Sequence, residues 1–136
     1  MRHLWSLLCE RTLISEQNNI SIIEVLEQLA FDLLPEGDPE ANPVMGGLTL
    51  VSLFSREDLN EPESFQYKLR IVGPNGTQMG ETAQRELSLQ EHRRVRSINR
   101  LDGIPLTAGA GVYEFEVIAD GTVVASVPLE VIITGI

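Results

Sequence analysis

The chain has 136 residues, of which 43% are hydrophobic and 22% charged, a composition typical of one globular domain and unlike that of a disordered chain. Its formal net charge of −10 argues against a general attraction to nucleic acid or to an anionic membrane surface. The only cysteine, Cys9, excludes an intramolecular disulfide and favours a reducing compartment, so we expect a single cytoplasmic domain over residues 1–136.

The first apolar stretch, residues 4–9, is short. Glu10 and Arg11 follow it directly, so it lacks the length of a signal-peptide core and of the ~20 apolar residues that span a bilayer. We therefore expect a buried first strand and no membrane association.

Clusters of turn-forming residues separate short apolar segments throughout the chain. Gly and Asn accept positive φ and Pro presets φ, so such clusters mark turns, and their spacing is typical of an all-β domain. The clusters are Glu36-Gly37-Asp38, Asn42-Pro43, Gly46-Gly47, Gly73-Pro74-Asn75-Gly76, Asp102-Gly103, Gly109-Ala110-Gly111 and Asp120-Gly121.

The C-terminal third predicts a β-hairpin. Apolar and acidic residues alternate over 113–117, Asp120-Gly121 favours a type I′ turn, and every second residue over 123–133 is apolar. Residues 65–71 alternate in the same way, with a return strand predicted over 82–89.

Leu48 to Phe54 is apolar on both parities, which predicts a strand buried on both faces. Taken together, these segments predict a two-sheet antiparallel β-sandwich, C2-like or immunoglobulin-like, with about seven or eight strands.

Residues 20–31 allow two interpretations. Their apolar residues recur at helical spacing, and Ser21-x-x-Glu24 has the form of a capping box, which would make the domain α+β. A polar turn over 15–19 and the β-branched run 20–25 instead favour a strand paired with the first one. Both interpretations stay open on the residues alone.

Leu7-Leu8-Cys9-Glu10 and the later run 19–27 resemble the start of a family of short, uncharacterised bacterial proteins. Those proteins open with a Cys-Asp-like strand, a turn and a strand of the type K-L-S-L-I-G-I-F-D. The ending over 106–115 and 120–125 is also similar to that family and to C2-like and immunoglobulin-like sandwiches. The resemblance implies a β-sandwich with residues 20–31 mainly in strands, and it implies neither an activity nor any functional residue.

The residues suited to nucleophilic or metal chemistry are few. His3, Cys9 and His92 have no local catalytic motif around them, and three candidates do not complete a tetrahedral zinc site. We therefore expect no catalytic residues, no cofactor and no metal, and we interpret the chain as a non-enzyme; an enzyme of unrecognised type remains an alternative.

Two acidic groups suggest a second alternative, a calcium- or small-ligand-binding sandwich. Calcium prefers six to eight oxygen ligands, and loops of a sandwich can supply them. A solvated acidic surface explains the same residues without a ligand. The groups are Asp32, Glu36, Asp38 and Glu40, and Glu57, Asp58, Glu61 and Glu63.

The most distinctive feature is a basic cluster of Arg93, Arg94, Arg96 and Arg100. In a strand, the last three share one face with Ile98. They suit either a charged edge that prevents unwanted sheet pairing or a docking face for an acidic protein partner. No aromatic residues interleave them to stack bases, which argues against nucleic acid. We expect a non-catalytic protein-interaction or scaffolding module that binds another protein, or itself, through this face or a sheet edge.

Overall fold

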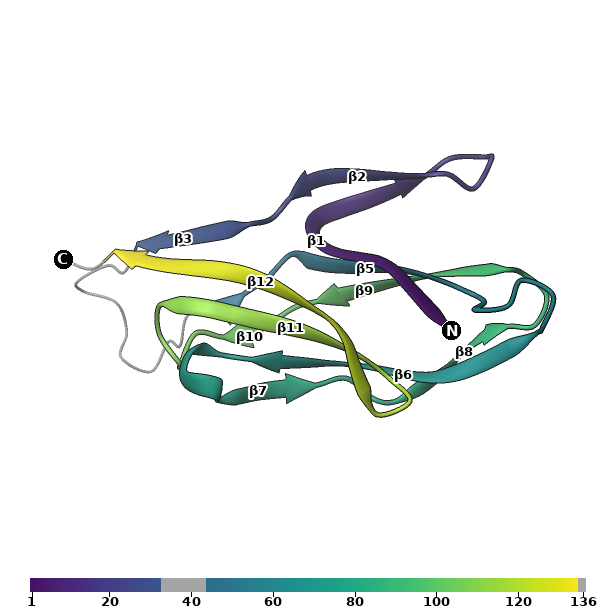
Figure 1. The fold of residues 1–136 in the computed structure, drawn as a ribbon. Coiled ribbons are helices and arrows are strands. Elements are labelled where there is room, and N and C mark those ends of the chain that lie inside the picture. The colour runs from purple at the N-terminus through teal and green to yellow at the C-terminus, as the bar shows by residue number, and fades with distance from the viewer. Residues whose placement is uncertain (33–43, 135–136) are drawn as a thin grey trace.

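The computed structural model describes residues 1–32 and 44–134 and shows a chain composed almost entirely of strands (Figure 1). The turns expected at 36–38 and 42–43 lie outside these residues. The strands are β1 (Arg2–Ile14), β2 (Ile20–Val25), β3 (Gln28–Asp32), β4 (Val44–Met45), β5 (Leu48–Ser55), β6 (Glu63–Val72), β7 (Gln78–Glu81), β8 (Arg85–Leu89), β9 (Arg94–Leu101), β10 (Ile104–Pro105), β11 (Gly111–Ala119) and β12 (Thr122–Thr134), with one 3₁₀ turn, η1 (Pro74–Gly76).

Two sheets make up the domain. Sheet A has the strand order β2-β1-β5-β9 and is antiparallel throughout. Sheet B has the order β3-β12-β11-β6-β7, with β8 also paired to β6, and β4 and β10 form a separate short ladder. The predicted β-sandwich is confirmed. The described residues hold twelve strands rather than seven or eight, and sheet B is mixed because β3 joins β12 in parallel.

The C-terminal hairpin forms as its alternation predicts. Asp120 and Gly121 both have positive φ, 48° and 79°, as a type I′ turn requires. Tyr113 and Phe115 on β11 are buried and lie opposite Leu129 and Val127 on β12. The hairpin therefore supplies the centre of sheet B.

The core lies between the sheets, where aromatic rings from both sheets meet. The ring of Phe54 on β5 lies 4.9 Å from that of Phe65 and 5.9 Å from that of Tyr67, both on β6. Such tilted and edge-on contacts add to the free energy gained by burying the rings. Leu8, Leu50 and other aliphatic residues complete this cluster.

Residues 20–25 and 28–32 form two strands, so the helical interpretation of residues 20–31 is wrong. The Ser15–Asn19 turn places β2 against β1, with Ile22 opposite Thr12, and Glu24 has a φ of 55°, which no α-helix accommodates. The backbone pairing offered by β1 outweighs the local helical periodicity. Beyond Val25 the chain leaves sheet A and continues as β3 at the edge of sheet B, so one segment spans both sheets (Figure 1).

Strand β1 pairs with different strands in its first and second halves. Residues 2–9 pair with β5, residues 11–14 pair only with β2, and Cys9 pairs with both strands. In Figure 1, β1 bends where it leaves β5, so that residues 10–25, here called the arm, run back beside sheet A. The arm carries exposed apolar side chains, among them Leu13, Ile14 and Val25.

Strand β5 is buried on both faces, as predicted. Leu50 points into the core and Val51 points to the outer face of sheet A, yet both are 0% exposed. In the register, Leu7 on β1 and Ile98 on β9 lie on either side of Val51. The arm lies over this side of sheet A, since Arg96 on β9 donates to the carbonyl of Asn18 at the tip of the arm.

A row of serines crosses the inner face of sheet A. Ser6, Ser52 and Ser97 lie opposite one another on β1, β5 and β9, and the Oγ atoms of Ser6 and Ser52 are 2.6 Å apart. His3 Nε2 lies 2.7 Å from Ser6 Oγ at one end, and Arg85 Nη2 donates to Ser97 Oγ at 2.8 Å at the other. We call these three residues the serine row. Their hydroxyls find partners inside the sandwich, as buried polar groups must.

Tyr67 connects the serine row to sheet B. Asn99 Nδ2 donates to the Tyr67 hydroxyl at 2.7 Å and to Ser97 Oγ at 2.9 Å. The Arg85 guanidinium lies 5.4 Å from the centroid of the Tyr67 ring, a cation–π distance. Burial raises the pKa of the Tyr67 phenol, so it stays protonated. These contacts fasten β6 and β8 to β9.

We expect Tyr67→Phe to lower the free energy of unfolding by about 1–3 kcal/mol, because the half-buried Asn99 amide loses the acceptor that the buried Tyr67 hydroxyl provides. Urea unfolding followed by circular dichroism measures the change. Tyr113→Phe is the matched control, because it also removes a buried phenolic hydroxyl. That hydroxyl donates only to the Gly109 carbonyl in a loop, so its removal should lower the free energy of unfolding by less. Equal losses in the two variants would contradict a stabilising role for the polar contacts around the serine row.

Candidate functional site

Strand β9 presents the predicted basic residues on the outer face of sheet A. Arg94, Arg96 and Arg100 share the outward parity with Ile98, while the alternate residues point inward and include the buried Ser97. Arg93 precedes the strand. We call these four arginines the arginine face.

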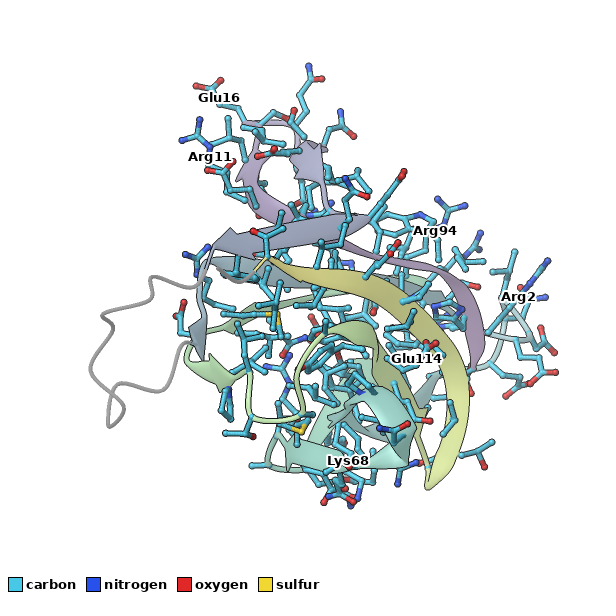
Figure 2. The ribbon with its side chains drawn as sticks, turned by 90° about the vertical axis from the view of Figure 1, so that its left-hand side faces the viewer. Arg2, Arg11, Glu16, Lys68, Arg94 and Glu114 are labelled. Atoms are coloured by element: carbon cyan, nitrogen blue, oxygen red, sulfur yellow. The ribbon has the colours of Figure 1, made fainter. Side chains whose placement is uncertain are left out.

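A hollow of about 600 Å³ lies between the tip of the arm and the first residues of β9. The arm contributes the turn residues Asn18 and Asn19, and the sheet contributes two arginines over an apolar floor. Figure 2 shows Arg94 directed away from the body of the molecule, on the side of the arm. The lining residues are Asn18, Asn19, Ile20, Leu53, Arg94, Val95 and Arg96.

Arg96 joins the two walls of this hollow. Its Nη2 donates to the Asn18 carbonyl at 2.8 Å, and its Nε is buried without a partner among the described residues. Asn18 has a φ of 62°, a conformation that Asn tolerates better than most residues, and its amide donates to the Ser15 carbonyl. The turn therefore aims a carbonyl at the guanidinium and holds the arm tip over the sheet.

The four arginines differ in what they contact. Arg100 Nη1 donates to the Glu10 carbonyl at 3.1 Å, and its Nε lies 3.4 Å from an Asp102 carboxylate oxygen, so its charge is partly offset. Arg93 and Arg94 are exposed, and their side chains make no hydrogen bond or ion pair within the part of the chain that the structure describes. Arg94 is thus a free cation at the rim of the hollow.

Several other cations of the chain are paired. Lys68 Nζ lies 2.9 Å from Glu81 and Arg70 Nε lies 2.7 Å from Glu116, each within sheet B. The hollow, in contrast, holds two guanidinium groups and no carboxylate among its lining residues. On a chain with a net charge of −10, this is a local positive field that attracts anions.

The structure does not bring His3, Cys9 and His92 together into one site. His3 contacts the Phe54 ring and Ser6 inside the sandwich, Cys9 is fully buried in β1, and His92 is exposed in the turn before β9. Burial raises the pKa of the Cys9 thiol, which disfavours the nucleophilic thiolate.

Sequence reasoning did not anticipate the contact between His3 and the serine row. A histidine 2.7 Å from a serine hydroxyl has the spacing of a base and a nucleophile. Here the hydroxyl of Ser6 also bonds the fully buried Ser52, so we interpret the contact as one that holds β1 and β5 in register. His3 and Ser6 are close in sequence, but the buried Ser52 that completes the contact lies 46 residues from Ser6, so no sequence pattern indicated it.

The acidic groups gather no metal site within residues 1–32 and 44–134, where no cluster of three or more His, Cys, Asp or Glu side chains occurs. Glu36, Asp38 and Glu40 of the first group lie outside these residues. In the second group, Glu63 accepts the Glu57 amide at 2.9 Å. Asp58 accepts a hydrogen bond from the Asn60 amide at 3.0 Å. Both carboxylates therefore stabilise the loop between β5 and β6 through backbone hydrogen bonds.

The fold defines a two-sheet β-sandwich protein. The sequence model of one protein family matches residues 4–132, and the chain therefore belongs to that family, a family of unknown function (DUF6941). This confirms the resemblance to an uncharacterised family. No curated protein matches the chain. Over the described residues, the structure contains no helix long and apolar enough to cross a membrane.

Acidification should destabilise the fold partly through His3. Burial lowers the pKa of this imidazole, so folding favours its neutral form. Its stabilising contribution is complete above the unfolded-state pKa of about 6.5 and is lost as the pH falls through the lower folded-state pKa. We expect wild type to lose more stability than His3→Gln between about pH 7.5 and about pH 5.5. Urea midpoints at both pH values test this; His92→Gln, at an exposed position, is the control, and identical losses in wild type and His3→Gln would contradict it.

Proposed function

We propose that this protein is a non-catalytic interaction module that binds an acidic segment of a partner protein at the arginine face. The observation that carries the proposal is the hollow between the arm and β9, with Arg94 and Arg96 in its lining. Guanidinium groups bind carboxylates through paired, planar hydrogen bonds, so acidic side chains are the protein groups that fit them best.

The remainder of the hollow supports a protein ligand. Ile20 and Leu53 provide apolar contact beneath the charged groups. A site with an apolar centre and Arg at its margin has the anatomy of a protein interface. The positive field would steer an acidic partner to this face, while the negative body of the protein would repel it elsewhere.

A nucleic acid fits less well. Single strands bind where bases stack on aromatic side chains, and none of the residues lining the hollow is aromatic. The net charge of −10 also opposes the binding of a phosphate backbone beyond the immediate face. With its buried, unpaired Cys9, the protein suits a reducing compartment, and we place it in the cytoplasm as part of this proposal.

We expect Arg94→Glu combined with Arg96→Glu to weaken the binding of a fluorescein-labelled octaglutamate probe at least about tenfold, because attraction becomes repulsion. Fluorescence anisotropy at low salt measures the affinity. The matched control is Arg2→Glu with Arg11→Glu, which makes the same change in net charge at two exposed arginines outside the hollow.

Arg94→Glu alone should also weaken binding, and because this side chain makes no hydrogen bond or ion pair within the described residues, the substitution breaks no bond that holds the arm. Equal weakening by the control pair would show a response to net charge and would overturn the proposal. Tighter binding of single-stranded DNA than of the peptide, with the same dependence on Arg94, would replace the protein ligand by a nucleic acid.

A further inference from the structure

Strand β9 is the last strand of sheet A, and within the described residues no strand pairs with its other edge. It has eight residues, and all eight pair with β5 without a register shift. None of them has positive φ. An edge of this kind presents a row of backbone N–H and C=O groups that can pair with another strand.

The other sheet edges are less suited to pairing. At the opposite edge of sheet A, β2 has six residues and is interrupted by Glu24, whose φ is 55°. At the edges of sheet B, β3 has five residues and β7 has four. Residues 122–129 of β12 lie beyond β3 and also lack a partner on that side among the described residues, but they include Pro128, which has no N–H. Their register with β11 also shifts between Val117 and Ile118. Strand β9 is therefore the longest edge without such an interruption in the part of the chain that the structure describes.

We propose that the acidic partner segment binds as an additional antiparallel β-strand on the free edge of β9. This inference rests on the proposed function and adds the conformation of the ligand and its sequence pattern. Backbone hydrogen bonds to β9 would supply affinity, and side chains on alternate positions would supply specificity, as in other cases of strand addition. All strand pairs of sheet A are antiparallel, and the added strand continues that pattern.

Charge determines which strand this edge accepts. In an antiparallel pair of two β9 strands, residues of one face meet residues of the same face, so a pairing centred on Ser97 would set Arg94 opposite Arg100. Like charges directly opposite each other destabilise a strand pair. The edge therefore disfavours a second copy of this chain, whereas carboxylates opposite the same arginines would stabilise the pair.

The spacing of β9 fixes the pattern of the partner. Residues two apart lie on the same face, about 6.6–6.8 Å from each other. An antiparallel partner therefore carries an acidic residue opposite Arg100, an apolar residue opposite Ile98, and acidic residues opposite Arg96 and Arg94. Ile98 is 37% exposed, which leaves apolar surface for that contact to cover.

The alternate positions of the partner would lie on the inner side of sheet A, where space is limited. Arg85 from β8 reaches Ser97 and Asn99 on that side, at 2.8 and 3.2 Å. We therefore expect small polar residues at these positions. The full pattern is acidic, small, apolar, small, acidic, small, acidic.

Two synthetic heptapeptides test the pattern. The first carries glutamate at positions one, five and seven, valine at three and serine elsewhere; the second has the same composition with the glutamates divided between both faces. We expect the patterned peptide to bind at least about tenfold more tightly in fluorescence anisotropy, because only its three carboxylates can all face the arginines.

N-methylation tests whether the backbone of the peptide pairs with β9. In a ladder, alternate residues direct their N–H groups to the neighbouring strand and the others direct theirs away. Methylating one alternate set of amides in the patterned peptide should weaken binding at least about tenfold, and methylating the other set should leave it unchanged. Amide hydrogen exchange in β9 should slow on binding of the unmodified peptide.

The outcomes separate the two proposals. Equal affinity of both heptapeptides, lost on Arg94→Glu, together with indifference to both methylation sets, would retain the acidic ligand and overturn strand addition. Binding by neither peptide, nor by octaglutamate, would overturn both. A sensitivity to one methylation set only, combined with dependence on Arg94, supports the added strand.

Discussion

The structure depends on the burial of β5 on both of its faces. Its inward residues, such as Leu50 and Phe54, form the core with β6, as any sandwich strand would. Its outward residues, such as Val51, would be exposed apolar surface in a simple two-layer sandwich. The bend in β1 places the arm over that face, and this reduces the exposure of the outward residues (Figure 1). The hollow beside Arg96 exists where this cover ends.

Register connects the core to the arginine face. A slip of β9 by one residue would turn its arginines inward and Ser97 outward. Ser97 lies opposite Ser52 in the sheet and bonds the side chains of Arg85 and Asn99, so the slip would break a buried polar network as well as the packing. The same contacts that hold β9 in place therefore keep the arginines on the outer face of sheet A.

The strands with one solvent-exposed face could be predicted from the sequence, since the alternation of apolar and polar residues over 65–71 and 113–117 is a local property of the chain. Ser21-x-x-Glu24 misleads because its helical spacing is also local, whereas the pairing with β1 that decides the conformation is not. The arginines could be placed on one face of a strand. The hollow beside these arginines could not be predicted, because its other wall contains Asn18, which lies 78 residues from Arg96 in sequence. The serine row escaped prediction for the same reason.

Charge at an exposed strand edge affects both which strands are repelled and which are attracted. Arginines on β9 would place like charges opposite each other in a pair of two copies, and charge of this kind is a common protection of edge strands. The protection is selective, however, because a strand of opposite charge meets attraction where an identical strand meets repulsion. The net charge of −10 would oppose the approach of such a strand to the rest of the protein. An edge that excludes most strands by charge thereby becomes specific for the few that carry the complementary pattern.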